Sequence, residues 1–473
     1  MNKSQLSSKP RLGFISTTMG SFDAVLDVPE VRDMNQYENL IIKIIDRLKT
    51  FADVINFGMA GNEEDATLLH ERIIQSDADL FVIFPVNYTL DVVILKLILG
   101  LRVPVILLNS APLSTIPEDM DANVTMENTT IACIPTITNV LIKNNIPYDL
   151  VNGTVNDDSV YDEIRKCSFS AMIVRKLRNT RIGVIGQSYP GISAVSVAES
   201  LVTGKFGVTL VRLDTNEIAK ECSAVPDSEV KRLSEEIQTK WSVTDITSGE
   251  ITASIRLLPA LEKIIEKYKI NAIAELCSLL VANNSIGIVP CYAATILTGR
   301  GIPFTCECDI ATTIAMLILQ GFSKDALFLE FYVQDFKQGL SLLSHCGIGN
   351  LNLARQDSPV CIKQHPYFPG AKGRGISFEY LTRKGLVTYA SLTVVGGRWR
   401  MIAGLGESVE MQKRPMSAVQ LYFKFKGNDF NRSLKKYCEL GGIHHMAVAF
   451  GNYLDELRLT CRYLDIDFFT PED

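Results

Sequence analysis

Leu80-Phe81-Val82-Ile83-Phe84 is the stretch that decides the fold of the first part of this 473-residue chain, because it is apolar at five consecutive positions. A strand with this pattern is covered on both faces, as the strands of parallel sheets are. Amphipathic segments at residues 37–51 and 65–75 alternate with similar apolar runs at residues 11–16, 53–57 and 103–108. The alternation predicts an α/β domain built on a doubly wound parallel sheet.

A second unit of the same kind is predicted after a helical stretch at residues 161–178. Its first strand, at residues 181–186, runs into a glycine-containing loop that carries Tyr189. Further strands are predicted at residues 208–213, 272–276 and 303–307, with helices at residues 251–267 and 309–320. Glu307 then ends a buried strand, and open α/β sheets bind ligands at the carboxyl ends of their strands.

The pattern changes beyond about residue 327, where alternating strands replace the helices. Strands are predicted at residues 375–380, 386–395, 398–403 and 419–426, and a last helix at residues 452–463. Gly396 and Gly397 lie between two of these strands and predict a hairpin. We therefore predict two successive doubly wound, Rossmann-like α/β domains at residues 1–165 and 166–325. A mostly antiparallel, β-rich C-terminal domain follows at residues 326–473.

Composition and charge narrow the class of protein. The chain is 47% hydrophobic and 21% charged, which is typical of globular proteins, and its net charge of -6 argues against a nucleic-acid partner. Residues 1–10 lack the apolar core of a secretory signal, and the apolar stretch at residues 80–109 is broken by charges and a proline. The eleven cysteines are scattered and fit free thiols. We expect a cytoplasmic protein that binds neither nucleic acid nor membranes.

Metal-competent side chains stand inside apolar runs late in the chain. Glu307 lies between two cysteines, Glu330 lies in an apolar strand, and His444 and His445 follow two glycines. His345 lies between the last two stretches, so this set holds three of the chain's five histidines. If these side chains converge, two carboxylates and one or two imidazoles would hold a divalent cation and leave room for the oxygens of a sugar.

Each of these residues, and the nearby Asp309, could also have a purely structural role instead of binding a metal. Asp309 has the side chain preferred at a helix N-cap. Glu307 is costly to bury alone, but a buried arginine or lysine would compensate it as well as a metal would. Glu330 would need no partner if it faced water from an edge strand. A single histidine such as His345 is more often a core or surface residue than a ligand.

Strand geometry guides two further choices. Adjacent side chains of a strand point to opposite faces, so only one of His444 and His445 is expected in any given site, and we choose His445. The same alternation places Cys306 and Cys308 on the face opposite Glu307. Their spacing is not that of a zinc knuckle, so we interpret both cysteines as packing residues.

Together these elements resemble the active-site signature of the L-arabinose and L-fucose isomerase superfamily. Glu307 matches the first glutamate of its Glu-x-Asp element, Glu330 the second carboxylate, and His445 the histidine near the carboxyl end. His345 matches an additional histidine of the arabinose isomerases, and residues 441–445 match their Gly-Gly-x-His-His element. The resemblance implies a Mn²⁺ site, with Mg²⁺ or Co²⁺ as alternatives, and His444 and Tyr189 become candidate substrate-binding residues.

The resemblance also implies a hexameric homo-oligomer that interconverts an aldose and a ketose. Glu307, Glu330, His445 and His345 would hold the metal, and the two glutamates would move protons at C1 and C2 of an open-chain monosaccharide through an enediolate. Which glutamate is the base, which sugar is used and whether it carries a phosphate or a sulfonate stay open. Two alternatives are a metal-independent glycosidase that uses Glu307 and Glu330, and a non-catalytic sugar-binding protein.

Overall fold

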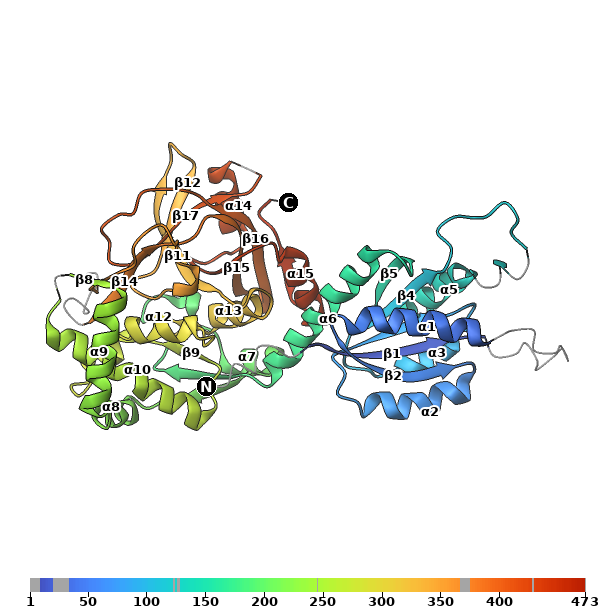
Figure 1. Ribbon diagram of the computed structural model, residues 1–473, viewed down its shortest axis with the longest axis horizontal. Coiled ribbons are helices and arrows are strands. Elements are labelled where there is room, and N and C mark those ends of the chain that lie inside the picture. The colour runs from blue at the N-terminus through green and yellow to red at the C-terminus, as the bar shows by residue number, and fades with distance from the viewer. Residues whose placement is uncertain are drawn as a thin grey trace. The chain divides into compact units, whose positions relative to one another are not determined.

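The computed structural model describes residues 9–19, 34–121, 124–125, 128–244, 246–365, 375–427 and 429–472. It consists of two compact units, Met1–Arg175 and Lys176–Asp473, each of which is described by itself (Figure 1). Most of the polar start of the chain, residues 1–8, lies outside the described residues. Within the described ranges, no helix combines the length and apolarity that a membrane span requires.

The first unit contains a five-stranded parallel sheet in the order β2-β1-β3-β4-β5. The four predicted strands are confirmed, and β5 is an additional strand at one edge. The strands are β1 (Arg11–Thr17), β2 (Asp53–Ala60), β3 (Leu80–Pro85), β4 (Val105–Ala111) and β5 (Asp149–Thr154). The helices are α1 (Met34–Lys49), α2 (Glu63–Ile74), α3 (Asp91–Ile98), α5 (Thr130–Lys143) and α6 (Asp158–Arg178), which runs into the second unit.

The position of each strand in this sheet determines its burial. The central strand β3 is buried at all six positions, as its continuous apolar sequence predicts. The expectation that β2 is covered on both faces is wrong, because β2 is an edge strand and several of its residues are exposed. Its apolar side chains are therefore only partly used in the core.

The second unit begins with a four-stranded parallel sheet in the order β10-β9-β6-β7. The strands are β6 (Arg181–Ile185), β7 (Thr209–Arg212), β9 (Ala272–Glu275) and β10 (Phe304–Thr305). The helices are α7 (Glu199–Phe206), α8 (Thr215–Ser223), α9 (Asp227–Lys240), α10 (Ser248–Tyr268), α11 (Cys277–Ala282), α12 (Cys291–Gly299) and α13 (Ile310–Ser323). A capping box between Thr247 and Glu250 begins the long helix α10.

The rest of the second unit is a largely antiparallel sheet, as predicted. Its strands are β8 (Ser242–Val243), β11 (Leu327–Asp335), β12 (Leu340–Ser344), β13 (Cys361–Gln364), β14 (Ile376–Leu381), β15 (Gly385–Val395), β16 (Arg398–Ser408), β17 (Val419–Phe425), β18 (His445–Phe450) and β19 (Asp467–Phe469), with helices α14 (Phe430–Glu439) and α15 (Leu454–Tyr463). A pairing between β16 and β17 closes the strands β16-β15-β18-β11-β12-β17 into an antiparallel barrel. Closure removes the free edges of these strands.

The predicted hairpin between β15 and β16 is confirmed. Val395 pairs with Arg398, and the two residues between them, Gly396 and Gly397, have φ angles of 59° and 79°. Two consecutive positive φ angles are those of a type I′ turn, which glycine adopts without steric cost.

Helix α13 joins the parallel sheet to the barrel within the second unit (Figure 1). The helix is apolar on nearly all sides, and it packs against β9 and β10 as well as against β15 and β18. The predicted boundary between the central and C-terminal domains falls just after α13 and inside this compact unit. The division into three domains stays a prediction. The N-terminal end of α13 thus meets both the parallel strands and the barrel.

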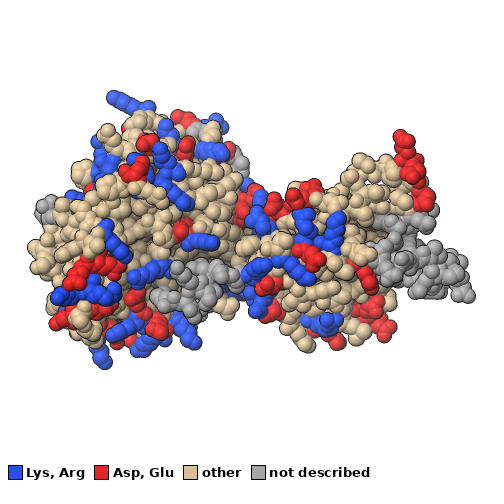
Figure 2. All heavy atoms as spheres, viewed as in Figure 1, with Lys and Arg blue, Asp and Glu red and all other residues tan. Residues whose placement is uncertain are grey.

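Acidic and basic side chains are mixed on the face of the molecule that Figure 2 shows. On α9, for example, Arg232 forms ion pairs with Glu229 and Glu236, and Glu236 also pairs with Lys240. Such exposed pairs contribute little to stability, because solvent screens the two charges. They are typical of a solvated surface.

Candidate active site

Glu307 lies in a sharp turn between β10 and α13. The strand ends at Thr305, and both Glu307 and Cys308 adopt left-handed backbone conformations, with φ angles of 57° and 55°. The amide of Cys308 donates a 2.8 Å hydrogen bond to the carbonyl of Glu275 at the end of β9. Non-glycine residues in this conformation are uncommon and cluster at functional sites.

The predicted strand at residues 303–307 is therefore too long, and the alternation argument for its cysteines is wrong. Because the strand ends at Thr305, strand geometry does not set the directions of the side chains that follow. The Cys306 side chain lies beside Glu275 and Cys277, whereas the Cys308 thiol contacts the carbonyl oxygen of Ala274.

Asp309 is the N-cap of α13, as its sequence position predicts. One carboxylate oxygen accepts a 2.9 Å hydrogen bond from the amide of Thr312, and the other accepts a 2.7 Å bond from the Thr312 hydroxyl. The second oxygen also lies 2.8 Å from Nδ1 of His445, and both side chains are fully buried. An ionised carboxylate only accepts hydrogen bonds, so Nδ1 of His445 donates and its Nε2 keeps a free lone pair.

Glu330 lies in the middle of the barrel wall and not on an edge strand. In β11 it is opposite His445 of β18 on one side and Ser344 of β12 on the other. The register of β11 shifts between Phe331 and Val333, which marks a bulge next to Glu330. Its side chain is 16% exposed, so solvent does not account for the charge.

His345 follows β12, and its side chain is buried next to Glu330. Its Nε2 atom lies 3.9 Å from a carboxylate oxygen of Glu330. The ring packs against Phe328, with centroids 4.6 Å apart, and Phe328 also packs against His445 at 4.5 Å. Burial, reinforced by the neighbouring histidines, holds the pKa of His345 well below its ordinary value. The imidazole is therefore neutral and able to act as a ligand.

His444 enters the same site as His445, so the expectation that only one of the two does is wrong. Strand β18 begins at His445, and His444 precedes it in a bend where strand alternation does not apply. The Nε2 atom of His444 lies 3.6 Å from Glu307 and 3.6 Å from Glu330. The corresponding atom of His445 lies 3.7 Å and 3.9 Å from the same two carboxylates.

These contacts between carboxylates and imidazoles are too long for hydrogen bonds. Ligand atoms of Glu307, His345 and His445 lie within 4.8 Å of one another, and so do those of Glu330, His444 and His445. Ligands of one ion bound at about 2.1 Å in octahedral geometry stand about 3.0 Å apart, so either group would need to contract to hold a cation. Three buried atoms of the site have no hydrogen-bond partner in the described chain: Glu307 Oε2, His345 Nε2 and His445 Nε2. Orphaned buried polar atoms are costly, and a metal ion would satisfy all three.

A metal ion accounts for the buried charge of Glu307 better than a basic side chain does. Within the described ranges, its ion pairs are with His444 and His445, and no arginine or lysine pairs with it. The pKa of His444 is raised, chiefly by the Glu307 carboxylate beside it. Burial raises the pKa of Glu330, against the opposing effect of His445 and His444.

Tyr189 contacts the main chain of Glu307, and Tyr332 lies two positions after Glu330. The amide of Tyr189, in the loop after β6, donates a 3.2 Å hydrogen bond to the carbonyl of Glu307, which places this predicted residue at the turn. Tyr332, at the bulge in β11, was not predicted; its hydroxyl lowers the pKa of Glu330 against the larger effect of burial.

Comparison with known proteins independently supports the resemblance to sugar isomerases. Residues 325–467 match the family described as the L-arabinose isomerase C-terminal domain. A sulfoquinovose isomerase from Priestia megaterium is 22% identical over 331 residues, which is 70% of this chain and 73% of that protein. An L-arabinose isomerase from Mycolicibacterium smegmatis is 20% identical over 311 residues, 64% of this chain and 62% of that protein. These matches support the resemblance of the chain to the arabinose/fucose isomerase-like superfamily.

The part of the chain that matches the superfamily's C-terminal domain contains Glu330, His345, His444 and His445, whereas Glu307 lies before it. A solved structure of a periplasmic sugar binding protein from Legionella pneumophila is 12% identical and covers 66% of this chain and 96% of that chain. Its TM-score of 0.17 is too low to carry an argument.

Proposed function

We propose that this protein is a metal-dependent isomerase that interconverts an aldose and a ketose. The observation that carries the proposal is the convergence of five side chains from four separate stretches of the chain: Glu307, Glu330, His345, His444 and His445. Three of their buried atoms lack hydrogen-bond partners among the described residues. The names of the sulfoquinovose and L-arabinose isomerases point to the same class of reaction.

We propose that Glu307, Glu330, His445 and His345 hold the metal ion. Oxygen and imidazole ligands suit Mn²⁺, with Mg²⁺ or Co²⁺ as alternatives, better than a metal that prefers thiolates. When bound, the ion stabilises negative charge on the oxygens at C1 and C2 of the open-chain sugar. Asp309 positions His445 by accepting its Nδ1 proton, which directs Nε2 toward the carboxylates.

The chain's own residues would carry the protons. One of Glu307 and Glu330 removes the proton from C2 and the other protonates C1, so that the reaction passes through an enediolate. We propose that His444 contacts the substrate, because its side chain is 33% exposed, the largest exposed fraction among the clustered carboxylates and imidazoles. The buried rings of Phe328 and His345 exclude water from the inner side.

The superfamily resemblance extends the proposal to the assembly. We propose a cytoplasmic homo-hexamer with three domains per chain, in which both parallel sheets are doubly wound. The strand order 2-1-3-4-5 of the first unit is one of the two common doubly wound orders and supports the last point. Light scattering coupled to size-exclusion chromatography measures the oligomer directly.

A panel of aldoses and ketoses tests the activity, and sulfonated sugars belong in it because several relatives are named sulfoquinovose isomerases. The purified protein is stripped of metal, assayed, and assayed again after addition of Mn²⁺. We expect isomerised product from at least one sugar only after the addition. The same experiment is run on Glu307→Gln and on Glu407→Gln, a matched change of an exposed glutamate in β16.

Three outcomes would contradict the proposal. Absence of isomerised product from every sugar would remove the catalytic claim. Hydrolysis of a glycoside that survives chelation would favour the glycosidase that uses Glu307 and Glu330. Tight sugar binding without turnover in the Mn²⁺-loaded protein would favour a sugar-binding protein.

A further inference from the structure

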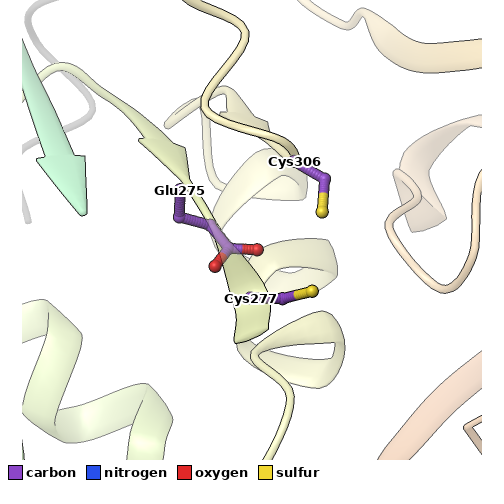
Figure 3. Close-up of side chains that lie close together, drawn as sticks. All are labelled: Glu275, Cys277 and Cys306. Atoms are coloured by element: carbon purple, nitrogen blue, oxygen red, sulfur yellow. The ribbon is translucent and has the colours of Figure 1, made fainter. Parts of the chain in front are cut away.

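A second cluster of metal-competent side chains lies beneath the turn that carries Glu307. It consists of Glu275 at the end of β9, Cys277 at the start of α11 and Cys306 just after β10, and we name it the thiol–carboxylate cluster. Figure 3 shows the carboxylate of Glu275 and the two sulfur atoms facing a common space. Segments that are far apart in sequence, residues 275–277 and residue 306, thus bring their side chains together.

The burial of Glu275 requires an explanation. Its side chain is 0% exposed, and in the described part of the chain neither carboxylate oxygen has a hydrogen-bond partner of normal geometry. Burial raises its pKa to about 8, and the neighbouring Cys306 thiol lowers it only in part. A buried carboxylate with no cation is costly unless it takes up a proton or a metal.

The geometry of the cluster matches a small tetrahedral ion. One ligand atom from each of the three residues lies within 4.8 Å of the other two. With bonds of about 2.3 Å to sulfur and about 2.1 Å to oxygen, tetrahedral zinc ligands stand about 3.5 to 3.8 Å apart. A shift of roughly 1 Å or less per side chain would therefore close the site.

We propose that Glu275, Cys277 and Cys306 form a second metal site, which takes a thiophilic divalent ion such as Zn²⁺. The donors distinguish it from the site around Glu307, because two sulfurs and one oxygen favour zinc or cadmium, whereas oxygens and imidazoles favour Mn²⁺. This inference does not depend on the proposed isomerase activity.

The alternative, that the cysteines only pack, accounts for less of the structure. Buried thiols are ordinary core residues, and Cys308 and Cys291 fit that description. Packing gives no reason for a carboxylate without partners between two thiols. A metal ion provides the partner for Glu275 and a role for both sulfurs.

Cadmium titration of the full-length protein tests the site. Cd²⁺ substitutes for Zn²⁺ and produces an ultraviolet charge-transfer band only when it binds thiolates, so ions bound by Glu307 and the histidines are not seen. Titration in saturating Mn²⁺ should give one tight phase with the intensity of two sulfur ligands per cadmium. In Cys277→Ser and Cys306→Ser we expect this phase to weaken at least about tenfold, because even the loss of an outer contact commonly costs that much.

Two further variants keep the test decisive. Glu275→Gln replaces the buried carboxyl group by a neutral amide of the same shape and should fold as well as the wild type, which a thermal melt checks; we expect weaker cadmium binding with an unchanged band per bound ion. Cys308→Ser is the matched control, two residues from Cys306 and outside the cluster, and should bind cadmium as the wild type does. The absence of a tight phase in the wild type, or its survival in both Cys277→Ser and Cys306→Ser, would overturn the proposal.

Discussion

Asp309→Asn separates the two tasks of one side chain. One oxygen of Asp309 caps α13 through the Thr312 amide, and the other accepts from His445 and from the Thr312 hydroxyl. Asparagine caps helices about as well as aspartate, so the helix should keep its stability to within a few tenths of a kcal/mol. Its single oxygen is then committed to the cap, which places the NH₂ group against Nδ1 of His445.

The substitution should lower the affinity for the metal. An NH₂ donor facing Nδ1 favours the imidazole tautomer that carries its proton on Nε2, the nitrogen directed at Glu307 and Glu330. The lost contact is a 2.8 Å bond between two fully buried groups, and charged hydrogen bonds contribute about 1.5 to 3 kcal/mol. That agrees with the roughly 10- to 100-fold loss of metal affinity seen when such partners are removed, about 1.4 to 2.7 kcal/mol.

Electron paramagnetic resonance of free Mn²⁺ measures the affinity, and a thermal melt without metal measures the stability. Asp429→Asn is the matched control, because Asp429 caps α14 through the Arg432 amide in the same way but lies away from the histidines. We expect weaker Mn²⁺ binding in Asp309→Asn alone, with both melting temperatures near that of the wild type. Mn²⁺ affinity within twofold of the wild type would refute the role assigned to Asp309.

Further predictions concern the carboxylates and the paired histidines. Glu330→Gln should lower kcat about 10²- to 10⁴-fold at saturating Mn²⁺, as the loss of a general acid or base does, whereas Glu407→Gln should leave it unchanged in the same steady-state assay. His445→Gln should weaken Mn²⁺ binding at least about tenfold in the titration above, whereas His444→Gln should mainly raise KM; equal effects on metal affinity would contradict the different roles. The metal-free protein should lose stability as the pH rises from about 4.5 to about 8, because folded Glu275 keeps its proton over that range and an unfolded glutamate does not, so the folded state binds more protons. Melting temperatures across this range should fall less in Glu275→Gln, and parallel curves for the two proteins would show that Glu275 does not titrate as described.

The local sequence pattern correctly predicted those strands and turns in which the order of apolar residues matches the burial seen in the structure. The apolar strands β1, β3 and β4 and the glycine hairpin between β15 and β16 have sequences that suit few other structures. The closure of the barrel was not predictable in this way, because the pairing of β16 with β17 depends on the packing of the whole sheet. The exposure of β2 likewise depends on its place at the sheet edge.

In the candidate site, too, local sequence predicted some residues and not others. Glu330 and His445 were predicted because polar side chains in apolar runs need partners, and the register of β11 with β18 places the two opposite each other. His444 was assigned to the wrong side because the start of β18 could not be located to one residue. Glu275 was overlooked, although it ends an apolar strand just as Glu307 was predicted to do. The same reasoning applied to β9 would have found it.

The central claim is that one divalent ion binds between Glu307, Glu330 and His445, with His345 as a further ligand. Crystals grown with Mn²⁺ and measured at the manganese absorption edge test it most directly. We expect one strong anomalous peak within about 2 to 2.4 Å of a carboxylate oxygen of each glutamate and of Nε2 of His445. A peak bound elsewhere, or no peak between these side chains in Mn²⁺-saturated crystals, would contradict the claim.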